Sequence, residues 1–402
     1  MATERFSKEF PNERQGGRRS RQSELNYSLI FGRRHLELLI VVSRHGEQIN
    51  AATSGIRTHW YDPAQRPAWY CIAFWFHRLF FTRRISREAK TLVAIARSLR
   101  VRGVISTDAY RGLIDAETHL PGTKLYWIQH GLFLDQGSFR LEREPNLPPS
   151  PTAITLFAVS PYDRKYFKRW GARPKRVLPV GSLKNGFYVS KLRNNSKKEN
   201  LYDICIIEKG LKPHPDNELG IHRRDGWQTF FQQFSTYCSS RQPRVIVALS
   251  PSEAQQEVKR WICDYFNYEF VFAPIDDEFA TYRASDASEL TVGQTSTVLS
   301  ESLSRKRKCL AINYTDIPFW DLPGDGISRL VRPNLPDLSS RLDYLLAIDW
   351  NQYWASIPQE VKDLTVEDPY NTLPIINEVL RFEVSDLDDS YSTRLTRNLG
   401  ST

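Results

Sequence analysis

The feature of this sequence that most limits its fold is a repeated alternation of short apolar runs with stretches of helical spacing. Such runs, bounded by turn residues, predict buried strands, and Ala, Leu and Ile at helical intervals predict helices between them. One helix is well delimited, since Ser160 can cap it, Pro161 suits its first turn and Gly171 closes it. In the first half we expect strands at 35–43, 102–110, 124–131, 153–160 and 176–182, and helices at 86–100 and 161–171.

The second half repeats this order after a polar, basic segment that we interpret as a linker from Lys184 to Asn200. We expect its strands at 202–208, 243–250, 269–274, 288–294 and 308–314, and its helices at 225–238, 252–266 and 296–305. Alternation of this kind predicts an α/β protein with parallel sheets flanked by helices. We therefore expect two Rossmann-like domains that face each other across a cleft, with ligands at the carboxyl ends of the strands.

Length and composition agree with two globular domains. A chain of 402 residues exceeds what one hydrophobic core usually serves, and 41% hydrophobic with 25% charged residues excludes a disordered protein. We predict an N-terminal acceptor-side domain at 1–190, a C-terminal nucleotide-sugar-binding domain at 191–350, and a helical extension with a tail at 351–402.

The sequence lacks the motifs that characterise several classes of protein. The five cysteines form no CxxC pair, which argues against a disulfide scaffold or a zinc site and, with a polar start that shows no secretory signal, favours the cytoplasm. The chain has no Walker loop, GxGxxG or GxSxG, so ATPase, dinucleotide oxidoreductase and α/β-hydrolase have no motif. The Asp-x-Asp string at 386–388 lies in a polar tail, and we predict no metal site.

The basic charge suggests an anionic partner. The formal net charge of +9 is concentrated in basic clusters that suit a phosphorylated ligand, an anionic lipid or nucleic acid. The aromatic residues do not alternate with arginine along one stripe, so we do not expect nucleic acid as the partner. The aromatic segment Trp69–Phe81 is too short to span a bilayer, which needs about 20 residues. It is either a buried helix or a peripheral membrane contact.

A histidine stands where the strand around Leu125 to Ile128 ends, in the string QHG. His130 is either a structural histidine or a general base at the cleft, because an imidazole titrates near neutral pH and can take the proton of an attacking hydroxyl. Asp108, which ends another strand, is an alternative base, a partner that orients His130, or an Asx turn.

The block LTVGQTSTVLSESLSRKRKCLAINY, at 290–314, places a turn of small residues between a strand and a helix that carries Ser, Thr and Glu. It resembles the C-terminal half of GT-B glycosyltransferases, in particular bacterial enzymes of capsule or O-antigen biosynthesis. QHG is similar to a recurrent feature of these enzymes, although related capsule enzymes carry an acidic motif ending in Gly there. The resemblance covers the order of elements over roughly 100–350 and implies a nucleotide-activated donor.

The residues of this block also suit a donor by their chemistry. A helix N-terminus offers free N–H groups and the positive end of its dipole to phosphate. Hydroxyl and amide groups at that end can bind phosphate oxygens, and Glu301 can accept hydrogen bonds from ribose or sugar hydroxyls. Ser296 either contacts the phosphate or serves only as the helix cap. The candidate donor-binding residues of this block are Gln294, Thr295, Ser296, Thr297 and Glu301.

Other candidates stand at further strand ends. Ser250 and Ser252 precede a helix, which suits either phosphate contact or capping. The basic string after the first strand of the second half resembles the HP motif of bacterial sialyl- and Kdo-transferases, but in that family the motif follows a later strand. The remaining candidates for donor contact are Gly181, Ser182, Lys209, Lys212 and His214.

We therefore expect a metal-independent glycosyltransferase that moves a sugar from a CMP-, CDP- or UDP-linked donor to a hydroxyl of a growing surface glycan or lipid-linked acceptor. It would need no cofactor and would work in the cytoplasm or at the inner face of the plasma membrane. The alternatives are a sugar-nucleotide epimerase of the same architecture, or a basic nucleic-acid-binding protein.

Overall fold

The structure is a computed structural model. It describes residues 38–41, 46–61, 87–107, 110–129, 131, 151–164, 173–192, 200–215, 217–250, 255–266, 268–294, 296–315, 317 and 321–384. Several residues with predicted roles lie outside these ranges, namely His130, Asp108, Thr295, Ser252 and the segment Trp69–Phe81.

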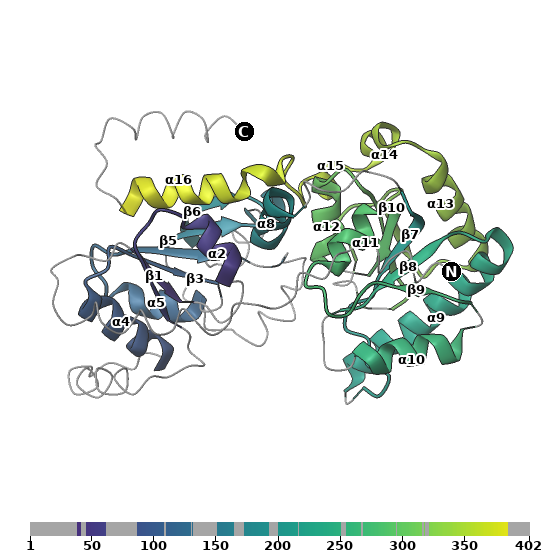
Figure 1. Cartoon of the computed structure of the whole chain (residues 1–402), viewed down its shortest axis with the longest axis horizontal. Helices are drawn as coiled ribbons and strands as arrows, with labels where there is room; N and C mark the ends of the chain where they lie inside the picture. Colours follow the sequence, from purple (N-terminus) through teal and green to yellow (C-terminus); the bar gives the residue numbers. More distant parts are fainter. Residues whose placement is uncertain are drawn as a thin grey trace.

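Two six-stranded sheets form two lobes that lie side by side (Figure 1). In the first sheet every neighbouring pair of strands is parallel. Its strands, in order across the sheet, are β2 (Thr58–Tyr61), β1 (Leu38–Val41), β3 (Gly103–Ser106), β4 (Lys124–Ile128), β5 (Pro151–Ala158) and β6 (Arg173–Pro179). We call this sheet with its helices the N-terminal lobe.

Helices cover both faces of the first sheet, so its strands are apolar on both sides. Side chains alternate along each strand: Leu39 and Val104 pack toward α4 (Arg87–Leu99) and α5 (Tyr110–Glu117), whereas Ile40 and Ile105 face the opposite side. That side is covered by α2 (Gly46–Ala52), α8 (Leu183–Lys191) and α16 (Thr372–Val384).

The second sheet is also parallel throughout. Its order is β12 (Arg329–Val331), β11 (Lys308–Asn313), β10 (Ser288–Gly293), β7 (Tyr202–Ile207), β8 (Val245–Ala248) and β9 (Val271–Phe272). The strand order therefore reverses between β7 and β10, and a crevice opens at the carboxyl ends of the strands at such a point.

The helices of this C-terminal lobe pack on both faces of the sheet. Trp227, Phe231 and Phe234 of α9 (Glu218–Arg241) form the largest buried cluster with residues of the sheet. Ala280 and Ala284 of α11 (Ala280–Asp286) pack on the other face. The remaining helices are α10 (Gln255–Tyr265), α12 (Thr297–Ser304), α13 (Leu335–Ala347), α14 (Trp350–Ser356) and α15 (Gln359–Lys362).

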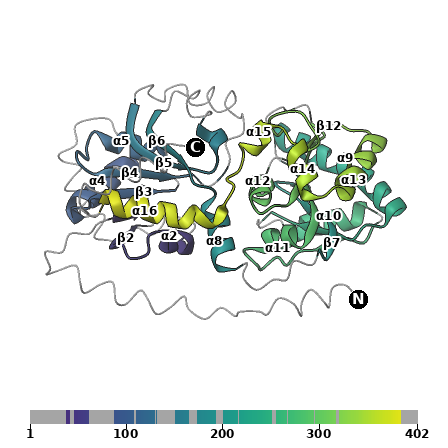
Figure 2. The ribbon, with the colours of Figure 1, turned by 90° about the horizontal axis from the view of Figure 1, so that it is seen from above.

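The chain crosses between the lobes twice. It leaves the first sheet through α8, and after α15 and the short 3₁₀ turn η4 (Pro369–Asn371) it returns as α16, which lies along the N-terminal lobe (Figure 2). The two crossings pack against each other, because the hydroxyl of Thr372 donates to the carbonyl of Val180 at 2.7 Å. Gly181 has a φ of +96°, and any β-carbon there would clash with Thr372.

The predicted fold class and most predicted elements are confirmed, but the linker from Lys184 to Asn200 is wrong in its first half. Residues 183–191 form α8, capped by the Ser182 hydroxyl, which accepts from the N–H of Asn185. The buried side of this helix includes polar side chains, because it faces a polar contact with the other lobe. Its composition therefore resembles that of a linker.

Within the described ranges, no helix combines the length and the apolar character needed to cross a bilayer.

Candidate functional site

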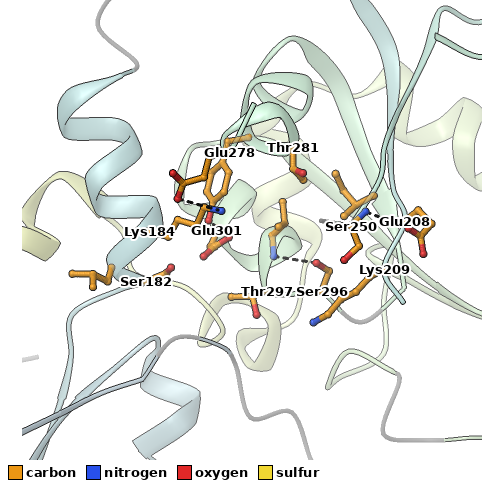
Figure 3. A pocket seen from close by; sticks show the side chains of 14 residues that line it. Ser182, Lys184, Glu208, Lys209, Ser250, Glu278, Thr281, Ser296, Thr297 and Glu301 are labelled. Atoms are coloured by element: carbon orange, nitrogen blue, oxygen red, sulfur yellow. Dashed lines mark hydrogen bonds and ion pairs between the residues drawn. The ribbon is translucent and has the colours of Figure 1, made fainter. Parts of the chain in front are cut away.

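An open cavity of about 180 Å³ lies where the two lobes meet, at the carboxyl ends of β7, β8 and β10. Figure 3 shows Ser182 and Lys184, from the start of α8, across from side chains of the C-terminal lobe. The lining of the cavity comprises Ser182, Leu183, Lys184, Ile207, Glu208, Lys209, Ser250, Glu278, Thr281, Tyr282, Ser296, Thr297, Val298 and Glu301.

The N-terminus of α12 forms one wall. Ser296 is the N-cap, since its hydroxyl accepts from the N–H of Val298 at 3.3 Å, and it also lines the cavity. Ser296 is therefore a helix cap, and a capping hydroxyl can still donate its own hydrogen to a ligand. The hydroxyls of Ser296 and Thr297 stand at the positive end of the helix dipole, which suits an anionic group.

Replacing both hydroxyls should weaken nucleotide binding without unfolding the protein. We expect Ser296→Ala with Thr297→Ala to lower nucleotide affinity by about 10- to 100-fold, the value of hydrogen bonds to charged groups. Losing the cap should cost about 1 kcal/mol of stability. Calorimetric titration measures the affinity, and Ser300→Ala is the matched control, because Ser300 bonds to the Thr297 carbonyl in the same helix and does not line the cavity. An unchanged affinity in a folded double variant would show that this helix end has only a structural role.

Glu301, one turn into α12, presents a carboxylate to the cavity. Its Oε2 accepts from the Tyr282 hydroxyl at 2.9 Å, and the residue is 5% exposed. Its other oxygen makes no hydrogen bond to any residue that the structure describes. The carboxylate can therefore accept hydrogens from ligand hydroxyls.

Lys209 supplies positive charge on the same side of the cavity as Ser296 and Thr297 (Figure 3). The side chain of Lys209 is exposed toward the cavity, but the protein around it removes part of its hydration. This desolvation lowers the pKa of Lys209, and the positive charge of Arg223 lowers it further. Glu301 has the opposite effect on this pKa. A bound phosphate would compensate the ammonium charge, so Lys209 and the α12 N-terminus together suit a diphosphate.

Glu208 directly follows β7 and is 3% exposed at the edge of the cavity. Its two oxygens accept from the N–H groups of Leu211, at 2.6 Å, and Ser250, at 3.2 Å, so the carboxyl joins the segments that follow β7 and β8. Burial raises the pKa of Glu208 to about 7, against the effect of these two hydrogen bonds and of Arg223.

The raised pKa of Glu208 predicts a pH-dependent stability. Between the unfolded value of 4.5 and about 7, the folded protein holds more protons than the unfolded chain. The free energy of unfolding should therefore fall as pH rises through this interval, by on the order of 3 kcal/mol for this group. Urea unfolding at pH 5 and pH 8 measures it, with Glu208→Gln as the reference that cannot titrate. A difference between wild type and Glu208→Gln that is equal at both pH values would contradict the prediction.

Residues of both lobes meet at a second edge of the cavity. The Nζ of Lys184 lies 4.0 Å from Oε1 of Glu278, which also accepts from the Nε2 of Gln48 at 3.1 Å. The same ammonium lies 5.3 Å from the ring centre of Phe279. The two lobes are therefore linked by contacts at the rim of the cavity.

The end of β4 lies close to the N-terminus of α12. A β-carbon built on Gly131 would lie 3.4 Å from Oγ1 of Thr297, so the residue after His130 approaches the N-terminus of α12. The Nε2 of buried Gln129 donates to the Gly131 carbonyl at 2.6 Å and to Asp163 at 2.8 Å. Asp163 in turn accepts from the Ser160 hydroxyl at 2.7 Å. These bonds hold the chain on both sides of position 130.

The structure brings together only part of the predicted site. Ser182, Lys209, Ser250, Ser296, Thr297 and Glu301 line the cavity. The other described candidates do not line it. Gly181 packs against Thr372, Gln294 lines a second, smaller pocket with Trp227 and Phe230, Lys212 is exposed, and His214 is 89% exposed beside Glu257.

Sequence reasoning missed Lys184, Glu208, Glu278 and Tyr282, which also line the cavity. Glu208 is the last residue of a predicted strand and Lys209 directly follows it, a signal that could have selected both. Lys184 was assigned to the linker, and α11, which carries Tyr282, was not predicted. No group of three or more His, Cys, Asp or Glu side chains in the described part of the chain is arranged to hold a metal ion.

Comparison with known proteins gives a fold but no family. No family model matches the chain, and no curated protein matches its sequence. A proposed UDP-N-acetylglucosamine 2-epimerase from Listeria monocytogenes has a similar structure, with a TM-score of 0.56 and 11% identity over 88% of this chain and 98% of that one.

Two further solved structures are similar. UDP-GlcNAc 2-epimerase from Neisseria meningitidis, bound to UDP-GlcNAc, has a TM-score of 0.51 and 12% identity over 85% of this chain and 98% of that one. S. aureus MnaA with UDP has a TM-score of 0.50 and 10% identity over 86% and 96% of the two chains. With the two parallel sheets, these similarities establish the GT-B architecture.

Proposed function

We propose that this protein is an enzyme that acts on a nucleotide-linked sugar. The observation that carries the proposal is the cavity at the reversal of strand order, where Lys209, the hydroxyls of Ser296 and Thr297, and the Glu301 carboxylate converge. The first three suit a diphosphate, and Glu301 suits the ribose or sugar hydroxyls. The similar structures bound to UDP-GlcNAc and UDP support this ligand class.

Within this class we propose a glycosyltransferase with His130 as general base. The base would take the proton of the acceptor hydroxyl as that oxygen attacks the sugar and the nucleotide leaves. The position of Gly131 beside Thr297 supports a base next to the donor. Asp108 is the alternative base or the partner that orients His130.

A sugar-nucleotide epimerase is the second candidate. It is favoured by two of the similar structures, which are named as UDP-GlcNAc 2-epimerases, one of them as proposed. An epimerase would use the same nucleotide site and would need no acceptor.

The acceptor that we propose is a hydroxyl of a growing bacterial surface glycan or of a lipid-linked intermediate, glycosylated in the cytoplasm or at the inner face of the plasma membrane. We also propose that no metal ion takes part, since cationic side chains and a helix N-terminus are available for the phosphates.

Turnover of nucleotide sugars with and without acceptor tests these proposals. Purified protein is incubated with UDP-, CDP-, CMP-, GDP- and ADP-linked sugars in EDTA, alone and with lipid-linked or oligosaccharide acceptors, and products are resolved by chromatography. Nucleotide release that requires an acceptor supports transfer, and a new epimer without acceptor supports the second candidate. Turnover of neither kind would exclude both, whereas activity that returns only with Mg²⁺ or Mn²⁺ would exclude metal independence.

A further inference from the structure

Tyr282 connects the carboxylate of the cavity to the buried contact between the lobes. Its hydroxyl donates to Oε2 of Glu301 at 2.9 Å, and Ser182, at the start of α8, lines the same cavity. Tyr282 is 3% exposed. Burial and the charge of Glu301 raise the pKa of the phenol well above its ordinary value, so the hydroxyl keeps its proton and acts as a donor.

The ring of Tyr282 is held on several sides. The guanidinium carbon of Arg305 lies 4.8 Å from its centre, the ring of Tyr188 lies 5.1 Å away, and Phe279 packs edge-on. Arg305 is itself fixed by Asp286 at 2.8 Å and by the side-chain oxygen of Asn185 at 2.6 Å. The phenol therefore cannot turn away from Glu301 without disrupting this packing.

We infer that Tyr282 is a positioning residue that makes the site select ribonucleotides over 2′-deoxyribonucleotides, by holding one oxygen of Glu301 so that the other faces the ligand. The inference rests on the proposed function, because it requires the ligand to be a nucleotide. A carboxylate held at one oxygen loses little freedom when its second oxygen accepts a ribose hydroxyl. Without the hydrogen bond from Tyr282, the Glu301 carboxylate would lose more conformational freedom when it binds the ribose, and the affinity would fall.

Tyr282→Phe tests this role, because it removes the hydroxyl and keeps the ring that contacts Arg305. UDP, CDP, ADP and GDP are titrated calorimetrically against the wild type, and the tightest binder is compared with its 2′-deoxy counterpart. We expect the wild type to prefer the ribonucleotide by about tenfold or more, the value of a hydrogen bond to a charged group. In Tyr282→Phe the preference should fall below about threefold, with a smaller change in affinity for the deoxynucleotide.

Tyr188→Phe is the matched control. It removes a phenol hydroxyl from the same cluster, one that donates to Asp286 at 3.2 Å and does not contact Glu301, so the ribose preference should persist. Glu301→Asp is the reference for loss of the ribose contact itself, because its shorter side chain withdraws the carboxylate from both Tyr282 and the ligand, so it should narrow the preference at least as much as Tyr282→Phe does.

The outcomes separate the two proposals. If the wild type binds none of these nucleotides, the proposed function fails and this inference fails with it. If the wild type binds a ribonucleotide without preference over its deoxy form, or if Tyr282→Phe keeps the preference, the inference fails while the nucleotide site stands. Loss of preference in Tyr188→Phe as well would reduce Tyr282 to a general structural role.

Discussion

His130→Gln should lower kcat by about 10²–10⁴, the usual contribution of a positioned proton transfer, with little change in the KM for the donor. Glutamine keeps a hydrogen-bonding side chain of similar reach, but it cannot take up a proton at neutral pH. The donor is expected to be held by the C-terminal lobe, so its binding should survive. The measurement is kcat per folded molecule, with the nucleotide sugar and acceptor identified by the turnover assay.

Two comparisons make this result decisive. His222→Gln removes a half-exposed histidine of α9 that lies 3.8 Å from Glu218, and it should leave kcat unchanged. His130→Ala should repeat the loss seen in His130→Gln. If either His130 variant keeps near-wild-type kcat in its folded fraction, the role of base passes to Asp108. A loss of stability with full activity in the surviving protein would mean a structural histidine.

Asp286→Ala should destabilise the protein by about 3–5 kcal/mol, because it leaves the buried guanidinium of Arg305 without its carboxylate. The two side chains are almost fully buried where α8 meets α11 and α12, with Nε of Arg305 2.8 Å from Oδ1 of Asp286. Urea unfolding followed by circular dichroism measures the change in the free energy of unfolding.

Asp325→Ala is the matched control, since Asp325 forms an ion pair of similar length, 2.9 Å to Arg329, but is fully exposed. Exposed pairs contribute little, so its unfolding curve should overlay that of the wild type. The double replacement Asp286→Leu with Arg305→Met should be less destabilising than Asp286→Ala, because no unpaired charge remains. Equal effects of Asp286→Ala and Asp325→Ala would show that burial of the Arg305 pair does not matter to stability.

Local patterns were sufficient for most of the architecture. The unit from β10 through α12 to β11 was predictable because its two apolar strands and the helix cap Ser296 lie close together in the sequence, so the local pattern indicates each element. The same reasoning located β7, β8 and the long helix α9. It failed for α8, where Asn185 is buried against Ser304, more than 100 residues away, so that polarity does not indicate exposure.

The alternation of short apolar runs with segments of helical spacing was sufficient to predict two parallel sheets flanked by helices. A strand that is buried on both faces must be apolar, whichever strands become its neighbours. The same alternation placed Ser250, Ser296, Thr297 and Glu301 near the carboxyl ends of strands, where parallel α/β sheets bind ligands. Tertiary structure alone decided which of these residues meet. Tyr282 reaches Glu301 across 19 positions, Lys184 reaches Glu278 from the other lobe, and α16 returns to the first sheet. Contacts of this kind depend on how whole elements pack, and no local spacing of residues records that packing.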